Sequence, residues 1–178
     1  MQRIVSGITS FEQHFLAVLE TPWIYRPLAC PHCGWSVLWR HGCYGRKADR
    51  GRQPRPSCNP VSILRYLCSD CWRTCSRLPR CVAPRRWYDW EVQQAVLEFV
   101  LNGGSLQRCS RCLCLDRRTV RRWRDWLNAH SETFTFFLRS RFPEWGRSPD
   151  GPSFWRQVFD SMPLAEVMAW LDREITVP

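Results

Sequence analysis

The chain has 178 residues, of which 44% are hydrophobic, so it can form one medium domain or two small ones with apolar cores. Its formal net charge is +10 at pH 7, and Lys47 is the only lysine among 26 basic residues. We find no run of about 18 apolar residues and no signal-peptide pattern, so we expect no membrane partner and a cytoplasmic location. Eleven cysteines in such a chain indicate metal binding or buried thiols rather than disulfides.

The N-terminal segment, residues 1–27, is predicted to contain one short amphipathic helix over residues 9–20. Thr9 or Ser10 is suited to cap this helix, and Pro22 is suited to stop it. The apolar residues at helical spacing are Phe11, Phe15, Leu16 and Leu19.

Residues 28–84 have the pattern of a small β module held together by a metal. Prolines and cysteine pairs surround two short alternating stretches, SVLWRHG and SILRYLC, which we interpret as strands. The charged segment 45–60 between them has no apolar periodicity, which is typical of a long connection.

Two CxxC pairs, Cys30 with Cys33 and Cys68 with Cys71, are the strongest chemical signal in the chain. Each pair can present two thiolates to one ion, and four thiolates complete a tetrahedral structural Zn²⁺ site. Such a closed site has no open coordination position, so we expect a structural metal and no catalysis by it. The alternative is that these are buried or paired cysteines. Other side chains of this region that are candidates for a substitute ligand or a second site are His32, His41, Cys43, Cys58, Cys75 and Cys81.

Residues 85–130 are predicted to form three helices arranged as a helix-turn-helix domain. Ser105 is suited to cap the second helix, Cys114 and Leu115 form the turn, and Asp116 is suited to cap the third. The apolar positions of the three helices are Val92, Val96, Phe99 and Val100; Leu106, Cys109 and Leu113; and Val120, Trp123 and Leu127.

The third of these helices carries a concentration of arginine that predicts contact with a polyanion. Residues 105–130 hold seven arginines against two aspartates. An arginine-rich composition can reflect a GC-rich genome, but that does not explain the clustering. Arginine pairs with guanine edges and with phosphates, so we predict that Arg117, Arg118 and Arg121 read bases and that Arg122 and Arg124 meet phosphates. The full set of predicted DNA-binding residues is Arg117, Arg118, Thr119, Arg121, Arg122, Arg124, Arg46 and Lys47. The alternative is a solvated charged face of an ordinary helix bundle.

The C-terminal segment, residues 131–178, is predicted to form two or three short helices after a Pro/Gly-rich break. Its many apolar residues are expected to pack on the rest of the chain or on a protein partner. The candidates for that packing are Phe154, Trp155, Val158, Phe159, Val167, Met168, Trp170 and Leu171.

The order of the motifs CPHCGWSVLWRHGCYGR, ILRYLCSDCWRTCSRLP and SLQRCSRCLCLDRRTVRRW resembles the N-terminal DNA-binding half of bacterial insertion-sequence transposases and their stand-alone relatives. The resemblance covers roughly residues 28–128. It implies a zinc ribbon with ligands at Cys30, Cys33, Cys68 and Cys71, followed by a helix-turn-helix that recognises transposon ends. The chain departs from that family at Cys109, Cys112 and Cys114, where aliphatic residues or glycine are usual. The 50 residues after 128 are too few for the two-metal catalytic domain of such enzymes.

The expected fold is therefore mainly α with a small β zinc ribbon, a helix-turn-helix and short C-terminal helices. The expected function is non-enzymatic binding of double-stranded DNA by a zinc-containing, nucleoid-associated protein of bacterial or mobile-element origin, acting as a regulator or a targeting subunit. An alternative is an assembly subunit of a larger nucleoprotein complex whose C-terminal helices dock a partner, with DNA contact secondary. A small nuclease and an RNA-binding protein are weaker hypotheses, because no His/Asp/Glu constellation converges and a helix-turn-helix favours duplex DNA.

Overall fold

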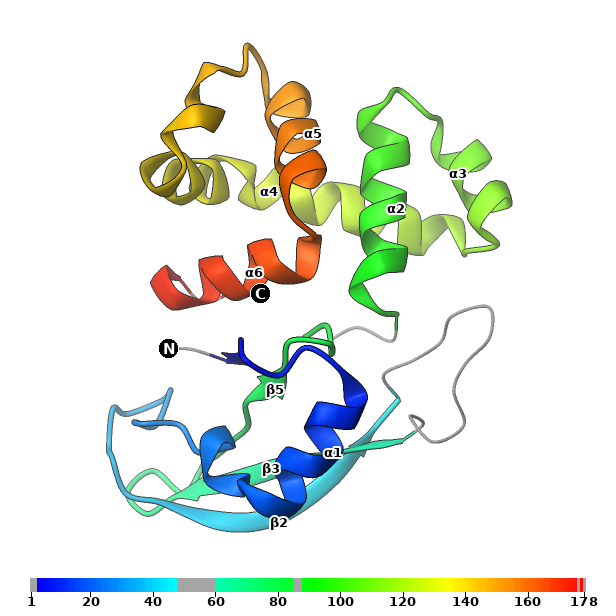
Figure 1. Cartoon of the computed structure of the whole chain (residues 1–178). Helices are drawn as coiled ribbons and strands as arrows, with labels where there is room; N and C mark the ends of the chain where they lie inside the picture. Colours follow the sequence, from blue (N-terminus) through cyan, green and yellow to red (C-terminus); the bar gives the residue numbers. More distant parts are fainter. Residues whose placement is uncertain (1–2, 48–59, 85–87, 176, 178) are drawn as a thin grey trace. The chain divides into compact units, whose positions relative to one another are not determined.

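The computed structural model describes residues 3–47, 60–84, 88–175 and 177 (Figure 1). This part of the chain is mainly helical, as the sequence predicted in outline: six α-helices together with two 3₁₀-helices make up 54% of it, and it contains a small amount of sheet. None of the described helices combines the length and the apolar character that crossing a lipid bilayer requires. The chain divides into two compact units, one formed by Met1–Trp90 with Met168–Pro178 and the other by Glu91–Val167.

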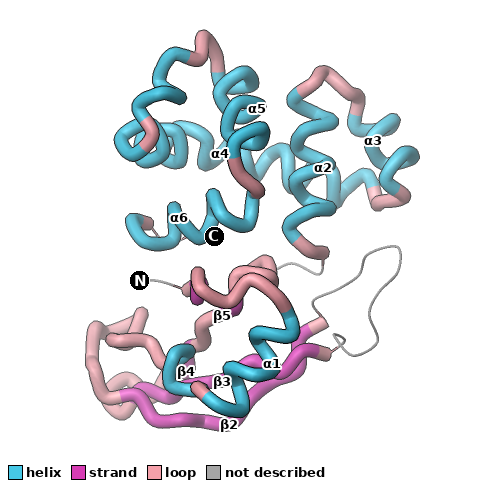
Figure 2. Tube along the Cα trace, in the orientation of Figure 1, coloured by secondary structure: helices cyan, strands magenta, loops and turns pink. Residues whose placement is uncertain are grey.

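The first unit contains a three-stranded antiparallel sheet in the order β2-β3-β4. Strands β2 (Leu38–Arg46) and β3 (Val61–Cys68) confirm the two predicted strands, and β4 (Thr74–Cys75) adds a short edge (Figure 2). Strands β1 (Ile4–Val5) and β5 (Leu78–Pro79) form a separate parallel pair. Of the predicted connection 45–60, residues 45–46 belong to β2, and residues 48–59 lie outside the described part of the chain.

Strand β3 is covered on both faces, which explains its nearly continuous apolar sequence. Leu64, Tyr66 and Cys68 pack into one hydrophobic cluster with Leu38 of β2. Val61 and Ile63 pack into a second cluster that also contains Leu78 and Val82. Because successive side chains of a strand point to opposite faces, the second face is apolar at the start of β3 and carries Arg65 toward its end.

Helix α1 (Phe11–Glu20) begins where the sequence predicted, but it buries a different face. Ser10 accepts a hydrogen bond from the N–H of Gln13 in a capping box, and Pro22 opens the short 3₁₀-helix η1 (Pro22–Tyr25) that follows. The side chains of Phe15, Leu16 and Leu19 are 36%, 56% and 79% exposed, whereas His14 and Ala17 are buried. The predicted apolar face is therefore wrong beyond Phe11, which does pack against the core.

A buried histidine determines which face of α1 turns inward. The Nδ1 atom of His14 lies 2.7 Å from the hydroxyl oxygen of Tyr25, and its Nε2 atom lies 2.9 Å from the carbonyl oxygen of Ser62 in β3. With both ring nitrogens hydrogen-bonded, the imidazole can be buried at little cost. Periodicity of apolar residues cannot reveal such a polar anchor.

The same histidine predicts a pH dependence of stability. Burial lowers the pKa of His14 below its ordinary value, against a smaller raising effect of the Ser62 carbonyl. Below about pH 6.5 the unfolded chain therefore takes up a proton more readily than the folded chain, and stability falls as pH falls. We expect the melting temperature of the native chain to drop more between about pH 7.5 and about pH 5.5 than that of His14→Gln. Equal drops in thermal unfolding experiments would contradict this.

In the second unit, helices α2 (Trp90–Leu101), α3 (Leu106–Leu113) and α4 (Arg117–Arg141) follow in the predicted order. Ser105 caps α3 by accepting from the N–H of Arg108 at 3.2 Å, and Asp116 caps α4 by accepting from the N–H of Arg118 at 2.7 Å. Cys114 between them adopts a left-handed conformation, with φ 53° and ψ 43°. Both predicted caps and the predicted turn are confirmed.

The turn between α2 and α3 depends on Gly104. A Cβ atom at this position would lie 2.1 Å from Cε1 of Phe99, and the N–H of Gly104 donates to the Phe99 carbonyl at 3.0 Å. We expect Gly104→Ala to destabilise the fold by about 1–3 kcal/mol, because both the Phe99 ring and its backbone carbonyl oxygen, 2.6 Å from the added Cβ, must move. Gly146→Ala is the matched control, since no atom lies within 4 Å of a Cβ there. Chemical denaturation of both variants measures the difference.

Helix α4 is longer than predicted, because it continues past residue 130 to Arg141. Phe134 and Leu138 extend the buried stripe of Val120, Trp123 and Leu127, so the apolar periodicity does not break where we placed a segment boundary. The 3₁₀-helix η3 (Pro143–Arg147) and helices α5 (Gly151–Ser161) and α6 (Leu164–Glu174) follow, which confirms short helices in the C-terminal segment.

Candidate metal centre and basic helix

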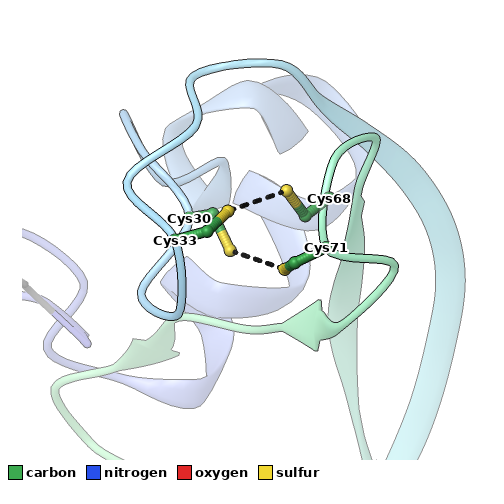
Figure 3. Close-up of side chains that lie close together, drawn as sticks. All are labelled: Cys30, Cys33, Cys68 and Cys71. Carbon is green, nitrogen blue, oxygen red and sulfur yellow. Dashed lines mark hydrogen bonds between the residues drawn. The ribbon is translucent and has the colours of Figure 1, made fainter.

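The four cysteines of the two CxxC pairs converge in the first unit (Figure 3). We call Cys30, Cys33, Cys68 and Cys71 the four-cysteine cluster. The Sγ atoms of Cys30 and Cys71 are 3.6 Å apart, and those of Cys33 and Cys68 are 3.5 Å apart. All four lie within 4.8 Å of one another, so each pair from one loop faces the pair from the other. The cluster is a candidate metal-binding site.

The geometry and the acidity of these thiols fit a metal ion. A tetrahedral site with metal–sulfur bonds of about 2.3 Å has sulfur atoms about 3.8 Å apart, close to the observed spacing. Burial raises the pKa of Cys30, but the N–H groups of His32 and Cys33 and nearby thiols lower it more, to about 7. The Trp35 N–H lowers the pKa of Cys33, yet burial and the other three thiols raise it to about 12. One thiolate is thus stabilised by the protein, whereas further thiolates need a cation.

The backbone of the two CxxC turns follows the same path, which positions the four sulfurs. The N–H of Gly34 donates to the carbonyl of Cys30 at 2.9 Å, and the N–H of Trp72 donates to the carbonyl of Cys68 at 3.2 Å. Both residues have a positive φ, 79° at Gly34 and 56° at Trp72. A glycine reaches this region without strain, whereas a tryptophan does not. Sequence reasoning did not single out Trp72.

No second metal site is found among the residues that the structure describes. The other predicted ligand candidates of this region, His32, His41, Cys43, Cys75 and Cys81, join no group of three or more potential ligands there. Cys58 lies outside the described residues.

The arginines of α4 lie mainly on its solvent-exposed side. Val120, Trp123 and Leu127 are buried, as predicted. Arg117, Arg118, Arg121 and Arg122 are exposed. At about 100° per residue, Arg118, Arg121 and Arg122 fall within about one quarter to one third of the helix circumference, opposite the buried stripe. We call these three residues the basic face.

The remaining predicted DNA-binding residues differ from one another in their surroundings. Arg124 is half-exposed and pairs with Asp125, with an N–O distance of 2.6 Å. Thr119 is half-buried beside Val120, and Lys47 is exposed. Arg46 is half-buried and donates a hydrogen bond to the carbonyl oxygen of Ala83. Arg124 and Arg46 are therefore partly engaged within the protein.

The C-terminal apolar residues that suggested a docking surface are mostly buried within the chain. Phe154, Trp155 and Val158 of α5 are at most 1% exposed. Within the second unit the Trp155 ring packs edge-on against Phe134, and its Nε1 donates to the hydroxyl of Ser131 at 2.9 Å. These side chains are covered without a partner, so they give no support to the assembly-subunit hypothesis.

Comparison with protein-family models, with curated proteins and with solved structures found no match in any of the three.

Proposed function

We propose that this chain is a zinc-containing DNA-binding protein that contacts duplex DNA through the N-terminal half of α4. The observation that carries the proposal is the basic face, Arg118, Arg121 and Arg122, at a position where positive charge is unfavourable for the helix itself.

Two local effects make this positive charge unfavourable for the stability of α4. The N-terminus of a helix carries a partial positive charge, so a cation in its first turn costs about 0.3–1 kcal/mol. The first turn of α4 holds Arg117 and Arg118 and no acidic residue. Like charges four residues apart cost about 0.2–0.5 kcal/mol per pair, and α4 has two such pairs, Arg117 with Arg121 and Arg118 with Arg122. A bound polyanion relieves both effects.

The order of helices around this charge supports recognition of a DNA groove. Helix α3, a short turn at Cys114 and Leu115, and the Asp116-capped start of α4 have the spacing of a helix-turn-helix motif. In that motif the N-terminal part of the second helix enters the major groove. Under this proposal Arg117, Arg118 and Arg121 reach base edges and Arg122 reaches phosphate, while Arg124, held by Asp125, contributes less.

Under the same proposal the four-cysteine cluster holds one structural zinc ion. Four sulfur ligands at this spacing suit Zn²⁺, which prefers closed tetrahedral thiolate sites when its role is structural. Bound zinc supplies folding energy by joining the loop before β2 to the turn after β3, in the manner of a zinc ribbon. With no open coordination position, the site serves binding rather than catalysis.

The proposal extends to the biological role through the motif order that resembles insertion-sequence transposases. A zinc ribbon followed by a helix-turn-helix fits a regulator or a targeting subunit that recognises specific DNA. Exposed Lys47 at the end of β2 is available to approach a phosphate, whereas neighbouring Arg46, which donates to the Ala83 carbonyl, contributes less under this proposal.

A binding selection tests this function. Zinc-loaded protein is titrated by fluorescence anisotropy against a randomised duplex pool and a matched RNA pool at low and physiological salt, and the bound DNA is sequenced. We expect duplex binding that weakens steeply with salt, because neutralised phosphates release counterions, together with an enriched sequence. Absence of duplex binding at low salt would overturn the proposal.

A further inference from the structure

A second basic site lies in the first unit. A pocket of about 610 Å³ is lined by Arg3, Arg46 and Arg65, together with Tyr44, Thr74 and Ser76. None of the described residues that line it is acidic. The guanidinium of Arg65 lies 5.2 Å from the centre of the Tyr44 ring, which orients it over the sheet. Three arginines around one pocket, with hydroxyl donors beside them, have the chemistry of a phosphate site.

Strand register places this pocket on the same sheet face as an exposed tryptophan. Trp39 pairs with Leu67, and Leu67 pairs with Thr74, so the three side chains form one row across the sheet. Arg65 is two residues from Leu67 on β3 and therefore shares this face. On β2, Tyr44 shares it as well, since it pairs with Ile63. We call this side of the sheet the arginine–tryptophan face.

Trp39 is joined there by a second exposed tryptophan. The rings of Trp39 and Trp72 meet edge to face, with centroids 6.2 Å apart. Their side chains are 51% and 67% exposed, so neither is accounted for by burial in a core. Exposed aromatic rings on the same surface as arginines are the combination with which proteins bind unpaired nucleotides.

The conformation of Trp72 gives independent support. It occupies the position in the second CxxC turn that Gly34 occupies in the first, with the same backbone hydrogen bond and a positive φ. A tryptophan is strained in this region, and its exposed indole gains little from packing that would offset the strain. Glycine would adopt this conformation without strain, so the stability of the fold does not account for a tryptophan here.

We propose that the arginine–tryptophan face binds single-stranded nucleic acid, with the pocket arginines holding backbone phosphate and the Trp39–Trp72 pair stacking on an unpaired base. The ligand differs from the duplex proposed for α4, so each proposal can be contradicted without affecting the other. Both single-stranded DNA and RNA present this chemistry, and the test distinguishes them.

Fluorescein-labelled oligothymidylate and oligouridylate of equal length are titrated with the full, metal-loaded chain by anisotropy, and a fluorescein-labelled duplex is titrated in parallel. Trp72→Gly relieves the strained backbone, so we expect its melting temperature to be unchanged or higher. We expect its affinity for the single strands to fall roughly tenfold with the lost stacking contact, and its duplex affinity to stay the same. Trp23→Ala, which removes another tryptophan that is 65% exposed, is the matched control.

A second variant tests the phosphate pocket. Arg65→Gln is expected to weaken single-strand binding and to reduce the salt slope by about 0.7, the contribution of one phosphate contact on a single strand. Wild-type single-strand affinity in Trp72→Gly and Arg65→Gln, or an equal loss in Trp23→Ala, would overturn the proposal. If substitutions in the basic face of α4 abolish duplex binding but spare oligothymidylate or oligouridylate binding, the two sites are separate. The oligonucleotide that binds more tightly identifies single-stranded DNA or RNA as the preferred ligand.

Discussion

Replacing Cys68 by serine is expected to abolish metal binding at the proposed zinc site and to unfold the first unit. Structural zinc sites contribute apparent binding free energies of about 10–16 kcal/mol at pH 7, which is comparable to or larger than the stability of a typical domain, about 5–15 kcal/mol. Cys68 is buried at the end of β3. Its loss leaves only three of the four sulfur ligands of the cluster. Metal analysis of the purified protein should give one equivalent for the native chain and none for the variant.

Cys43→Ser is the matched control, because Cys43 is an exposed thiol on β2 that does not belong to the four-cysteine cluster. It should retain one equivalent of metal and the native near-ultraviolet circular dichroism, whereas Cys68→Ser should lose that signal. A strong chelator added to the native chain should reproduce the effect of Cys68→Ser. If the native chain folds normally after complete metal removal, the proposal that the metal is structural is wrong.

The four-cysteine cluster could be predicted from sequence because its chemistry is encoded locally. Each CxxC spacing brings two thiols together through a single tight turn, so only the meeting of the two turns required the fold. The caps at Ser105 and Asp116 were predictable for the same reason, since a short polar side chain acts on N–H groups two or three residues away.

The buried face of α1 could not be predicted in this way. Apolar periodicity pointed to Phe15, Leu16 and Leu19, yet the structure exposes them and buries His14 instead. The histidine is held by Tyr25, eleven residues away, and by Ser62, forty-eight residues away. Such long-range hydrogen bonds leave no trace in a local pattern.

Trp72 shows a second limit of sequence reasoning. As part of CSDCWRTC it resembles any aromatic residue near a β-strand. Its positive φ, and the equivalence with Gly34 that makes it unexpected, become visible only when both turns are seen in three dimensions. The arginine pocket is similar, because Arg3, Arg46 and Arg65 come from three distant segments.

The two proposed binding surfaces share a physical argument. In each, the chain carries features that do not serve its own stability: like charges at a helix N-terminus in α4, and a strained, exposed tryptophan beside an arginine pocket in the first unit. A ligand that is anionic in both cases, and also carries unpaired bases in the second, accounts for both features.

Replacing Arg118, Arg121 and Arg122 together by glutamine is expected to lower duplex affinity while leaving the fold as stable as before, or more stable. Loss of the proposed Arg122 phosphate contact should reduce the salt slope by about 0.9. Loss of the proposed base contacts of Arg118 and Arg121, each worth about 1–3 kcal/mol, should lower the affinity for the selected duplex at least about 30-fold. Removal of both like-charge pairs, Arg117 with Arg121 and Arg118 with Arg122, and of a cation from the first turn of α4, should raise stability by about 0.7–2 kcal/mol. Anisotropy titrations at several salt concentrations and thermal unfolding measure the two effects.

Two further variants separate charge from recognition. Lysine at the same three positions keeps the charge but lacks the planar fork that pairs with guanine, so it should retain most of the binding to random duplex and lose the preference for the selected sequence. Arg147→Gln removes an exposed charge from η3 and should leave both properties unchanged. A glutamine variant that is more stable but binds duplex more weakly identifies a binding surface. Loss of a structural arginine would instead lower both the stability and the duplex affinity. If the glutamine variant binds the selected duplex with native affinity and salt slope, α4 is not the DNA-contacting helix.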